Sequence, residues 1–175
     1  MIRFQKVFLA AALAAGAASA SAEIVLEGVH WQAGRVEGGA AWQDVRVLED
    51  GPPRLENRLR ARLVLKNRGP KTEETLLLRY SLTARIAPVA GAATEGSWTI
   101  PFAVEERRVP KVAPGKTIEV PLDAGVALGL YLRRLVRASW WPDRVRLQVM
   151  LEPHPGSASL QTVEDTLEVV REGKP

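Results

Sequence analysis

The stretch LRARLVLKNRGPKTEETLLLRYSLTARI, Leu59 to Ile86, decides the fold. Apolar and polar residues alternate one for one on both sides of a central turn. The apolar phase consists of Leu59, Ala61, Leu63 and Leu65 before the turn, and of Leu76, Leu78, Tyr80, Leu82, Ala84 and Ile86 after it. Because successive strand side chains point to opposite faces, the stretch predicts two strands, each with one buried and one solvated face. Such alternation is typical of antiparallel sheets.

Shorter segments of the same kind lie on both sides of this stretch. They are residues 23–31, 42–48, 98–104, 117–122 and 144–152, and the inward residues expected from them are Trp98, Ile100, Phe102, Val104, Ile118, Val120, Leu122, Val145, Leu147, Val149 and Leu151. Pro101 has no amide donor and indicates an edge position or a bulge. Residues 160–172 fit either a helix or a returning strand, of which we prefer the strand. About eight strands separated by turns predict an all-β, antiparallel sandwich.

One segment breaks the pattern. On a helix over residues 126–139, a single apolar face collects Leu128, Tyr131, Leu132, Leu135 and Val136. Arg133, Arg134 and Arg137 lie on the opposite side, together with Leu130. We expect Asp123 to favour the first turn and Pro142 to stop the helix. The simplest interpretation is a crossover helix that links strands in opposite sheets and covers one open end of the sandwich.

Two parts of the chain resemble the immunoglobulin-like accessory domains of exported bacterial proteins. They are ARLVLKNRGPKTEETLLLRYSL, in which a strand ends in N-x-G, and VPKVAPGKTIEVPL, in which a P-G turn precedes a later strand. The resemblance covers residues 59–122. It implies an immunoglobulin-like β-sandwich and no particular activity, and the cysteine pair of antibody domains is absent.

The first 22 residues have the pattern of an export signal. Arg3 and Lys6 precede the apolar run VFLAAALAAGAA, and the small residues Ala20-Ser21-Ala22 follow it. We expect cleavage before Glu23 and a single domain over residues 23–175; an uncleaved anchor is the alternative. The protein would then be exported, to the periplasm or the cell surface. The chain has no cysteine, which excludes disulfides, zinc-thiolate sites and thiol catalysis and fits a bacterial envelope.

Charge and residue inventory argue against several function classes. Without Arg3 and Lys6, the 24 basic residues fall to 22 against 20 acidic ones, too balanced for general nucleic-acid binding. The histidines His30 and His154 fit structural positions, and no G-x-S-x-G motif accompanies them. Met150 with His154 is a weak copper signal. The carboxylate pairs, Glu73-Glu74, Glu105-Glu106 and Glu164-Asp165, are adjacent in strands or turns and so diverge. We expect no catalytic residue, metal or cofactor.

A non-catalytic binding role remains, as an accessory or assembly module of the cell envelope. The predicted contact patch is Arg133, Arg134, Arg137, Trp140 and Trp141, because arginine and tryptophan are enriched in partner hot spots. A protein partner ranks above an anionic lipid, since membrane-surface helices have wider apolar faces and more lysine. The alternative is a carbohydrate-binding module that uses exposed tryptophans. No segment after the signal is long and apolar enough to span a bilayer.

Overall fold

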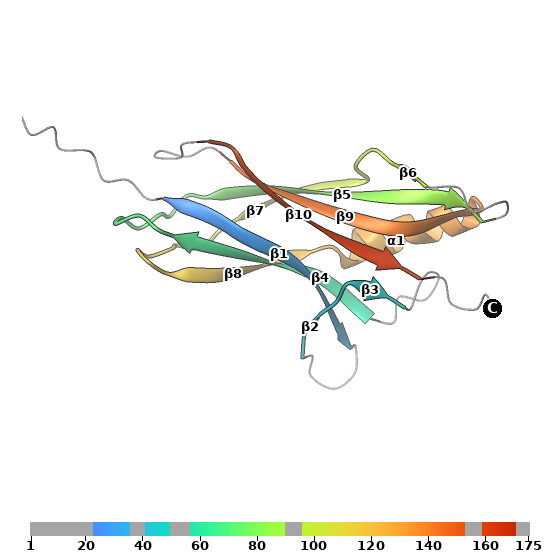
Figure 1. Cartoon of the computed structure of the whole chain (residues 1–175), viewed down its shortest axis with the longest axis horizontal. Coiled ribbons are helices and arrows are strands. Elements are labelled where there is room, and N and C mark those ends of the chain that lie inside the picture. The colour runs from blue at the N-terminus through green and yellow to red at the C-terminus, as the bar shows by residue number, and fades with distance from the viewer. Residues whose placement is uncertain (1–22, 36–40, 50–56, 90–95, 153–158, 171–175) are drawn as a thin grey trace, which may run out of the picture.

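The computed structural model describes residues 23–35, 41–49, 57–89, 96–152 and 159–170, and it shows two β-sheets packed face to face with one helix beside them (Figure 1). The residues of the predicted export signal and His154 lie outside the described residues. The all-β sandwich is therefore confirmed, with ten strands in the described part of the chain. In chain order the elements are β1 (Ile24–Arg35), β2 (Gln43–Asp44), β3 (Val47–Leu48), β4 (Asn57–Asn67), β5 (Leu77–Pro88), β6 (Ser97–Trp98), β7 (Ala103–Arg108), β8 (Thr117–Asp123), α1 (Gly125–Arg137), β9 (Trp140–Leu151) and β10 (Gln161–Val169).

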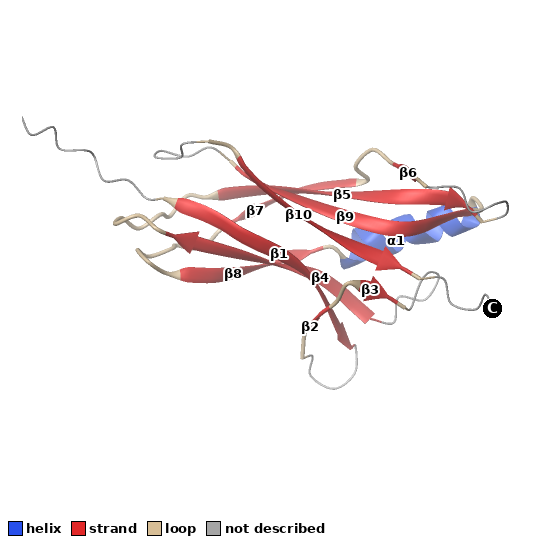
Figure 2. Cartoon of the chain, viewed as in Figure 1, coloured by secondary structure: helices blue, strands red, loops and turns tan. Residues whose placement is uncertain are grey.

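The two sheets differ in width, as Figure 2 shows. The four-stranded sheet has the order β2-β1-β4-β8, and the wider sheet has the order β3-β10-β9-β5-β6, with β7 also paired to β5. Neighbouring strands are antiparallel except β3, whose Val47 and Leu48 pair in parallel with Glu168 and Val169 of β10. The purely antiparallel expectation fails at this one short edge strand.

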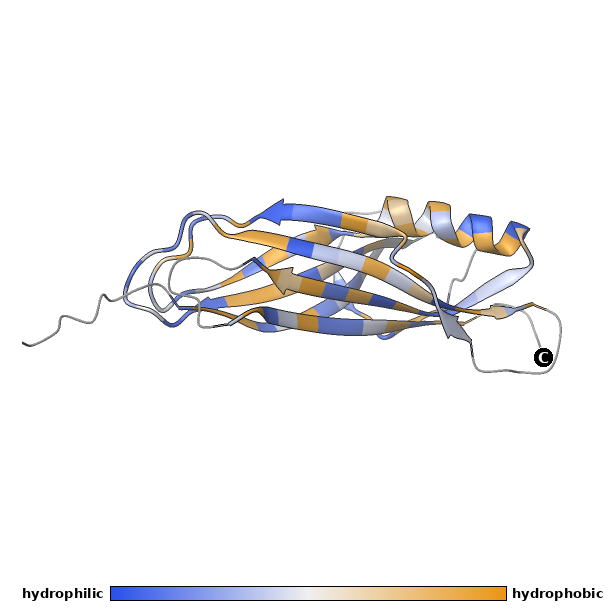
Figure 3. Ribbon diagram, turned by 90° about the horizontal axis from the view of Figure 1, so that it is seen from above, coloured by the Kyte–Doolittle hydropathy of each residue, from blue (hydrophilic) through white to orange (hydrophobic). Residues whose placement is uncertain are grey.

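The core lies between the sheets and follows the predicted alternation. The fully buried side chains of the central strands include Leu63, Leu65, Leu78, Leu82, Leu122, Leu147 and Leu151. Figure 3 shows this as alternating hydrophilic and hydrophobic bands along each strand. Residues 161–169 are a strand, as preferred, and Leu167 and Val169 of this strand are buried.

The prediction for residues 98–104 is wrong. Ile100 is 85% exposed, Val104 and Trp98 are also exposed, and only Phe102 is half-buried. Trp98 pairs in register with Arg85 and Ala103 with Leu82, so five steps along this segment match three steps along β5. The segment therefore bulges around Ile100-Pro101, between β6 and β7. Its phase is opposite to the expected one on both sides of the bulge, because Trp98 and Val104 lie opposite Arg85 and Ser81, which alternate with the buried residues of β5.

The helix links β8 of the narrow sheet to β9 of the wide sheet, so the predicted crossover is confirmed. Its buried residues are Leu128, Gly129, Leu132 and Leu135. Both expected end signals are wrong. The N-cap is Ala124, which makes no side-chain capping bond. The helix ends at Arg137 because Ser139 adopts a left-handed φ of 62° and its N–H bonds to Val136 O, whereas Pro142 lies inside β9.

Side chains from β10 close one edge of the sandwich. Gln161 accepts a hydrogen bond from Leu26 N at 3.0 Å and donates one to Ile24 O. Asp165 accepts from Trp31 N at 3.2 Å, and the Trp31 indole donates to Asp165 O at 3.3 Å. The unpaired edge of β1 is thus satisfied by side chains of the other sheet. We call these contacts the β1–β10 seam.

The two motifs behind the family resemblance meet in one turn. Asn67 is fully buried, its Nδ2 donates to Lys71 O at 2.7 Å and to Val112 O at 3.0 Å, and its Oδ1 accepts from Gly69 N at 2.9 Å. Its carbonyl accepts from Gly115 N. Gly115 has a φ of 68°, which favours glycine. Asn67 therefore joins the end of β4 to the turn that precedes β8.

We expect Leu78→Asp to unfold the domain, because it places a charge without a partner in the core at a cost above about 4 kcal/mol. The neighbouring Leu77→Asp, on the half-buried opposite face, serves as the matched control and should cost far less. Urea unfolding followed by tryptophan fluorescence measures both variants. A folded Leu78→Asp protein with wild-type melting would contradict the strand phase.

Asn67→Ala should lower the free energy of unfolding by about 3 kcal/mol, because it leaves a buried N–H and two carbonyls without their partner. Arg68→Ala, at the exposed neighbouring position, should change it by less than about 0.5 kcal/mol. Thermal and urea unfolding of the two variants provide the comparison, and equal stabilities would show that the turn does not depend on Asn67.

Candidate partner-binding surface

The outer side of α1 exposes apolar and basic side chains in one stripe. Val126, Leu130, Arg133 and Arg137 are spaced four, three and four residues apart, which places them on the same side of a helix. Val126 is 81% exposed and Leu130 50% exposed. Arg134 is also exposed and lies next to the stripe. All three arginines predicted for the contact patch therefore share one accessible surface.

These arginines have no compensating charge within the described residues. Arg133, Arg134 and Arg137 make no ion pair there, and the sequence has no acidic residue between Asp123 and Asp143. Helix geometry accounts for part of this placement, since the carbonyl end of a helix attracts cations. The position of Arg133 before the last turn is not explained in this way.

Arginines on the outer faces of the sheets contrast with those of the helix. Arg62 lies between Asp44 at 2.8 Å and Glu119 at 2.6 Å. Arg79 pairs with Glu106 at 2.8 Å and with Glu152 at 2.9 Å. The positive charge of these sheet arginines is neutralised within the molecule, whereas that of the helix arginines is open to another molecule.

The structure separates the two tryptophans of the predicted patch. Trp140 begins β9 and is 40% exposed. Trp141 is half-buried, packs against the core, and its indole N–H donates to Val169 O at 3.4 Å. Trp140 is available for contact, while Trp141 anchors the exit of the helix. We define the helix patch as Val126, Leu130, Arg133, Arg134, Arg137 and Trp140.

Three contacts tie the helix to the wide sheet and to the segments beside it. At its start, the Tyr80 hydroxyl reaches Asp123 O at 3.1 Å. In its middle, the Tyr131 ring stacks on Phe102 with centroids 4.0 Å apart and planes inclined by 6°. After its end, Val89 N donates to Ser139 O at 3.0 Å. The helix is therefore held at its start, middle and exit.

The Tyr80 hydroxyl lies between the two sheets. It contacts Glu105 Oε2 at 2.9 Å as well as the Asp123 carbonyl, and it has a single proton to donate. Burial raises the pKa of this phenol well above its usual value, and hydrogen bonding to the nearby Glu105 carboxylate raises it further. Tyr80 thus stays neutral and links β5, β7 and the start of α1.

The remaining tryptophans take three different positions. Trp31 is completely buried in the core. Trp42 is half-buried with the Arg60 guanidinium 4.0 Å from its ring centroid. Trp98 is 41% exposed on the outer face of the wide sheet, with Arg146 at 4.4 Å. The arginine contacts of Trp42 and Trp98 were not predicted, because they join strands whose pairing the sequence does not specify.

Other candidate chemistry finds little support in the described residues. His30 is exposed on β1. No group of three histidine or acidic side chains there could hold a metal ion. The copper hypothesis pairs Met150 with His154, which lies outside the described part of the chain. Within the same residues, none of the helical structure is long and apolar enough to cross a membrane.

No protein-family model matches the sequence, and no curated protein matches it significantly. Solved structures give weak similarity. One is a β-glucosidase from Erythrobacter marinus, 13% identical over 85% of this chain and 16% of that chain, with a TM-score of 0.37. Another is the sporulation control protein Spo0M from Bacillus subtilis, 12% identical over 87% of this chain and 50% of that chain, with a TM-score of 0.36. The chain spans half of these proteins or less, and similarity at this level carries no information about activity.

The raised pKa of Tyr80 makes stability depend on pH under alkaline conditions. The unfolded chain releases the phenolic proton near pH 10 and the folded protein only at higher pH, so the stabilisation is complete below pH 10 and is lost as the pH rises above it. Between pH 9 and 11 the wild type should lose about 1 kcal/mol more stability than Tyr80→Phe. Urea unfolding at both pH values measures this, with Tyr131→Phe as control; equal losses in the wild type and Tyr80→Phe would contradict it.

Proposed function

We propose that this protein is an exported, non-catalytic binding module of the bacterial cell envelope that docks a protein partner through the helix patch. The N-terminal export pattern supports the location. The immunoglobulin-like resemblance of residues 59–122 implies a sandwich fold and no particular activity, and it is compatible with an accessory or assembly role. The thin inventory of acid–base and metal-binding groups supports binding rather than catalysis.

The observation that carries the proposal is the coincidence of exposed apolar groups and uncompensated charge on one fixed helix. Val126 and Leu130 supply apolar surface on the helix, and Arg133 and Arg137 supply charge beside it; Trp140, which begins β9 after the helix, adds an exposed aromatic ring. Protein contact sites combine apolar and aromatic anchors with arginine in this way. Because the helix is held at its start, middle and exit, docking would require little ordering of the backbone.

The partner that fits this surface is an acidic protein segment with apolar side chains. Carboxylates pair with arginine through strong, often bidentate hydrogen bonds, and the helix offers three guanidinium groups without an acid of its own. An anionic membrane fits less well. The exposed apolar stripe of this helix is narrow, whereas helices that lie on membranes have a broad apolar face rich in large residues.

Glycan binding is the second candidate, and the exposure of two tryptophans at one end of the wide sheet favours it. Trp98 pairs in register with Arg85, and Trp140 with Pro88, so both lie near the end of β5. Planar aromatic rings at that end offer stacking surface to sugars. Trp31 is excluded by burial and Trp42 is half-covered, which leaves Trp98 and Trp140 as the candidate stacking rings.

A photo-crosslinking amino acid at Leu130 should capture a partner in intact cells, whereas the same probe at Lys71, in the turn after β4, should not. The double variant Arg133→Glu/Arg137→Glu should abolish the Leu130 adduct and weaken the purified complex by at least about tenfold, because it replaces attraction by repulsion. Mass spectrometry of the adducts and binding measured at two salt concentrations test both expectations.

Lys71→Glu/Lys116→Glu changes the net charge by the same amount at exposed positions outside the helix patch and is the matched control. An unchanged Leu130 adduct in the Arg133→Glu/Arg137→Glu variant would overturn the proposal. Absence of any adduct, combined with a tryptophan fluorescence change on titration with polysaccharides, would favour the glycan candidate.

A further inference from the structure

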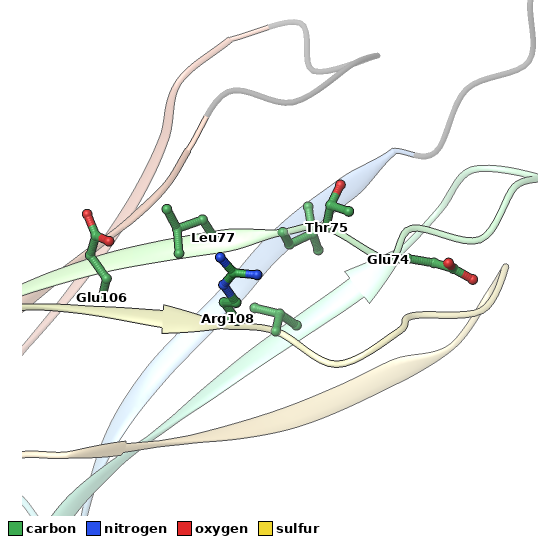
Figure 4. A pocket seen from close by; sticks show the side chains of 7 residues that line it. Glu74, Thr75, Leu77, Glu106 and Arg108 are labelled. Atoms are coloured by element: carbon green, nitrogen blue, oxygen red, sulfur yellow. The ribbon is translucent and has the colours of Figure 1, made fainter.

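A small hollow lies on the wide sheet where β5 begins and β7 ends, far along β5 from the helix exit. It has a volume of about 330 Å³. Leu76, Leu77 and Val109 line it with apolar surface, of which Leu76 and Val109 are buried. Figure 4 shows Arg108 and Leu77 on adjacent strands at this hollow, with Glu106 on one side and Thr75 and Glu74 on the other. Leu77 and Arg108 are direct partners in the β5–β7 register.

Around the hollow, the acidic side chains are already paired and the arginine is not. Glu106 bonds to Arg79 at 2.8 Å, and Glu74 bonds to Lys111 at 2.7 Å. The Thr75 hydroxyl bonds to Glu73 at 3.3 Å. Within the residues that the structure describes, the Arg108 side chain has neither an ion pair nor a hydrogen-bond partner. The hollow therefore presents one uncompensated guanidinium group beside an apolar floor.

We propose that the β5–β7 hollow binds a small carboxylate with an aliphatic side chain, such as the C-terminal residue of a peptide. The carboxylate would pair with Arg108, whose planar guanidinium matches its two oxygens. The aliphatic group would cover Leu76, Leu77 and Val109. A volume of 330 Å³ lies at the lower end of the range of ligand pockets, about 300–1,000 Å³, which limits the ligand to one or two residues.

This site is independent of the helix patch. The hollow sits where Leu77 begins β5, whereas the helix exits beside Val89 at the other end of that strand. Binding at the helix patch and binding at the hollow can therefore be lost separately.

The test uses N-acetyl-leucine and N-acetyl-leucinamide, which differ only in the charge of the terminal group. Added to the isotope-labelled protein, the acid should produce saturable NMR shifts of the backbone amides of Leu77, Arg108 and Val109. The amide should bind about tenfold more weakly, because it cannot form the charge-assisted pair. N-acetyl-glycine should also bind more weakly than N-acetyl-leucine, since it lacks the aliphatic group.

Variants separate the role of Arg108 from general charge. Arg108→Gln should reduce binding of the acid to the level of the amide, and Arg108→Lys should restore part of it. Arg107→Gln, an exposed neighbour of opposite strand phase, should bind as the wild type does. Equal binding of acid and amide, wild-type binding by Arg108→Gln, or no saturable shift around the hollow would each overturn the proposal.

Discussion

A sandwich of two sheets exposes its interior along the two sides where the sheets end, and both sides must be shielded from water. The rest of the structure depends on how this shielding is achieved. On one edge, the amide and carbonyl groups of β1 that point away from β4 have no neighbouring strand over most of the length of β1. Gln161 and Asp165 supply the missing hydrogen bonds from the opposite sheet. On the other edge, the sheets end in β8 and β7, which are joined by the Tyr80 hydroxyl, and α1 fills the remaining length. Backbone groups and apolar side chains are thereby removed from water at both edges.

The closing role of α1 explains why its two sides differ so strongly. Its inner side must match the apolar interior, and the leucines at positions 128, 132 and 135 do so. Among the residues that the structure describes, no strand packs on its outer side, where Val126, Leu130, Arg133 and Arg137 are exposed. Arginines on the sheet faces are held by neighbouring acids, as Arg62 is by Asp44 and Glu119. The lack of such acids near Arg133 and Arg137 is therefore a property of this helix and not of arginine in this protein.

Much of the fold follows from the sequence because the period of two is strict in the central strands. The positions of Leu63, Leu78 and Leu147 follow from local alternation alone. Residues 98–104 show where this reasoning ends. This segment has two more residues than the part of β5 that it accompanies, and its phase is opposite to the one expected. Such a register depends on the pairing with β5 and not on the local sequence. The partial burial of Trp141 and the exposure of Trp140 also depend on the non-local pairing of β9 with β5. Likewise, the β5–β7 hollow exists only because β5 and β7 pair with each other, so no local sequence motif predicts it.

The β1–β10 seam also has a consequence for how the chain acquires its structure. It joins residues that are 134 to 137 positions apart, so the first strand cannot be completed until nearly the whole polypeptide has left the ribosome. Long-range pairing of this kind makes folding slow. The pairing of β1 with β4 needs only the first part of the chain, whereas closure of the sandwich at the seam waits for the last strand.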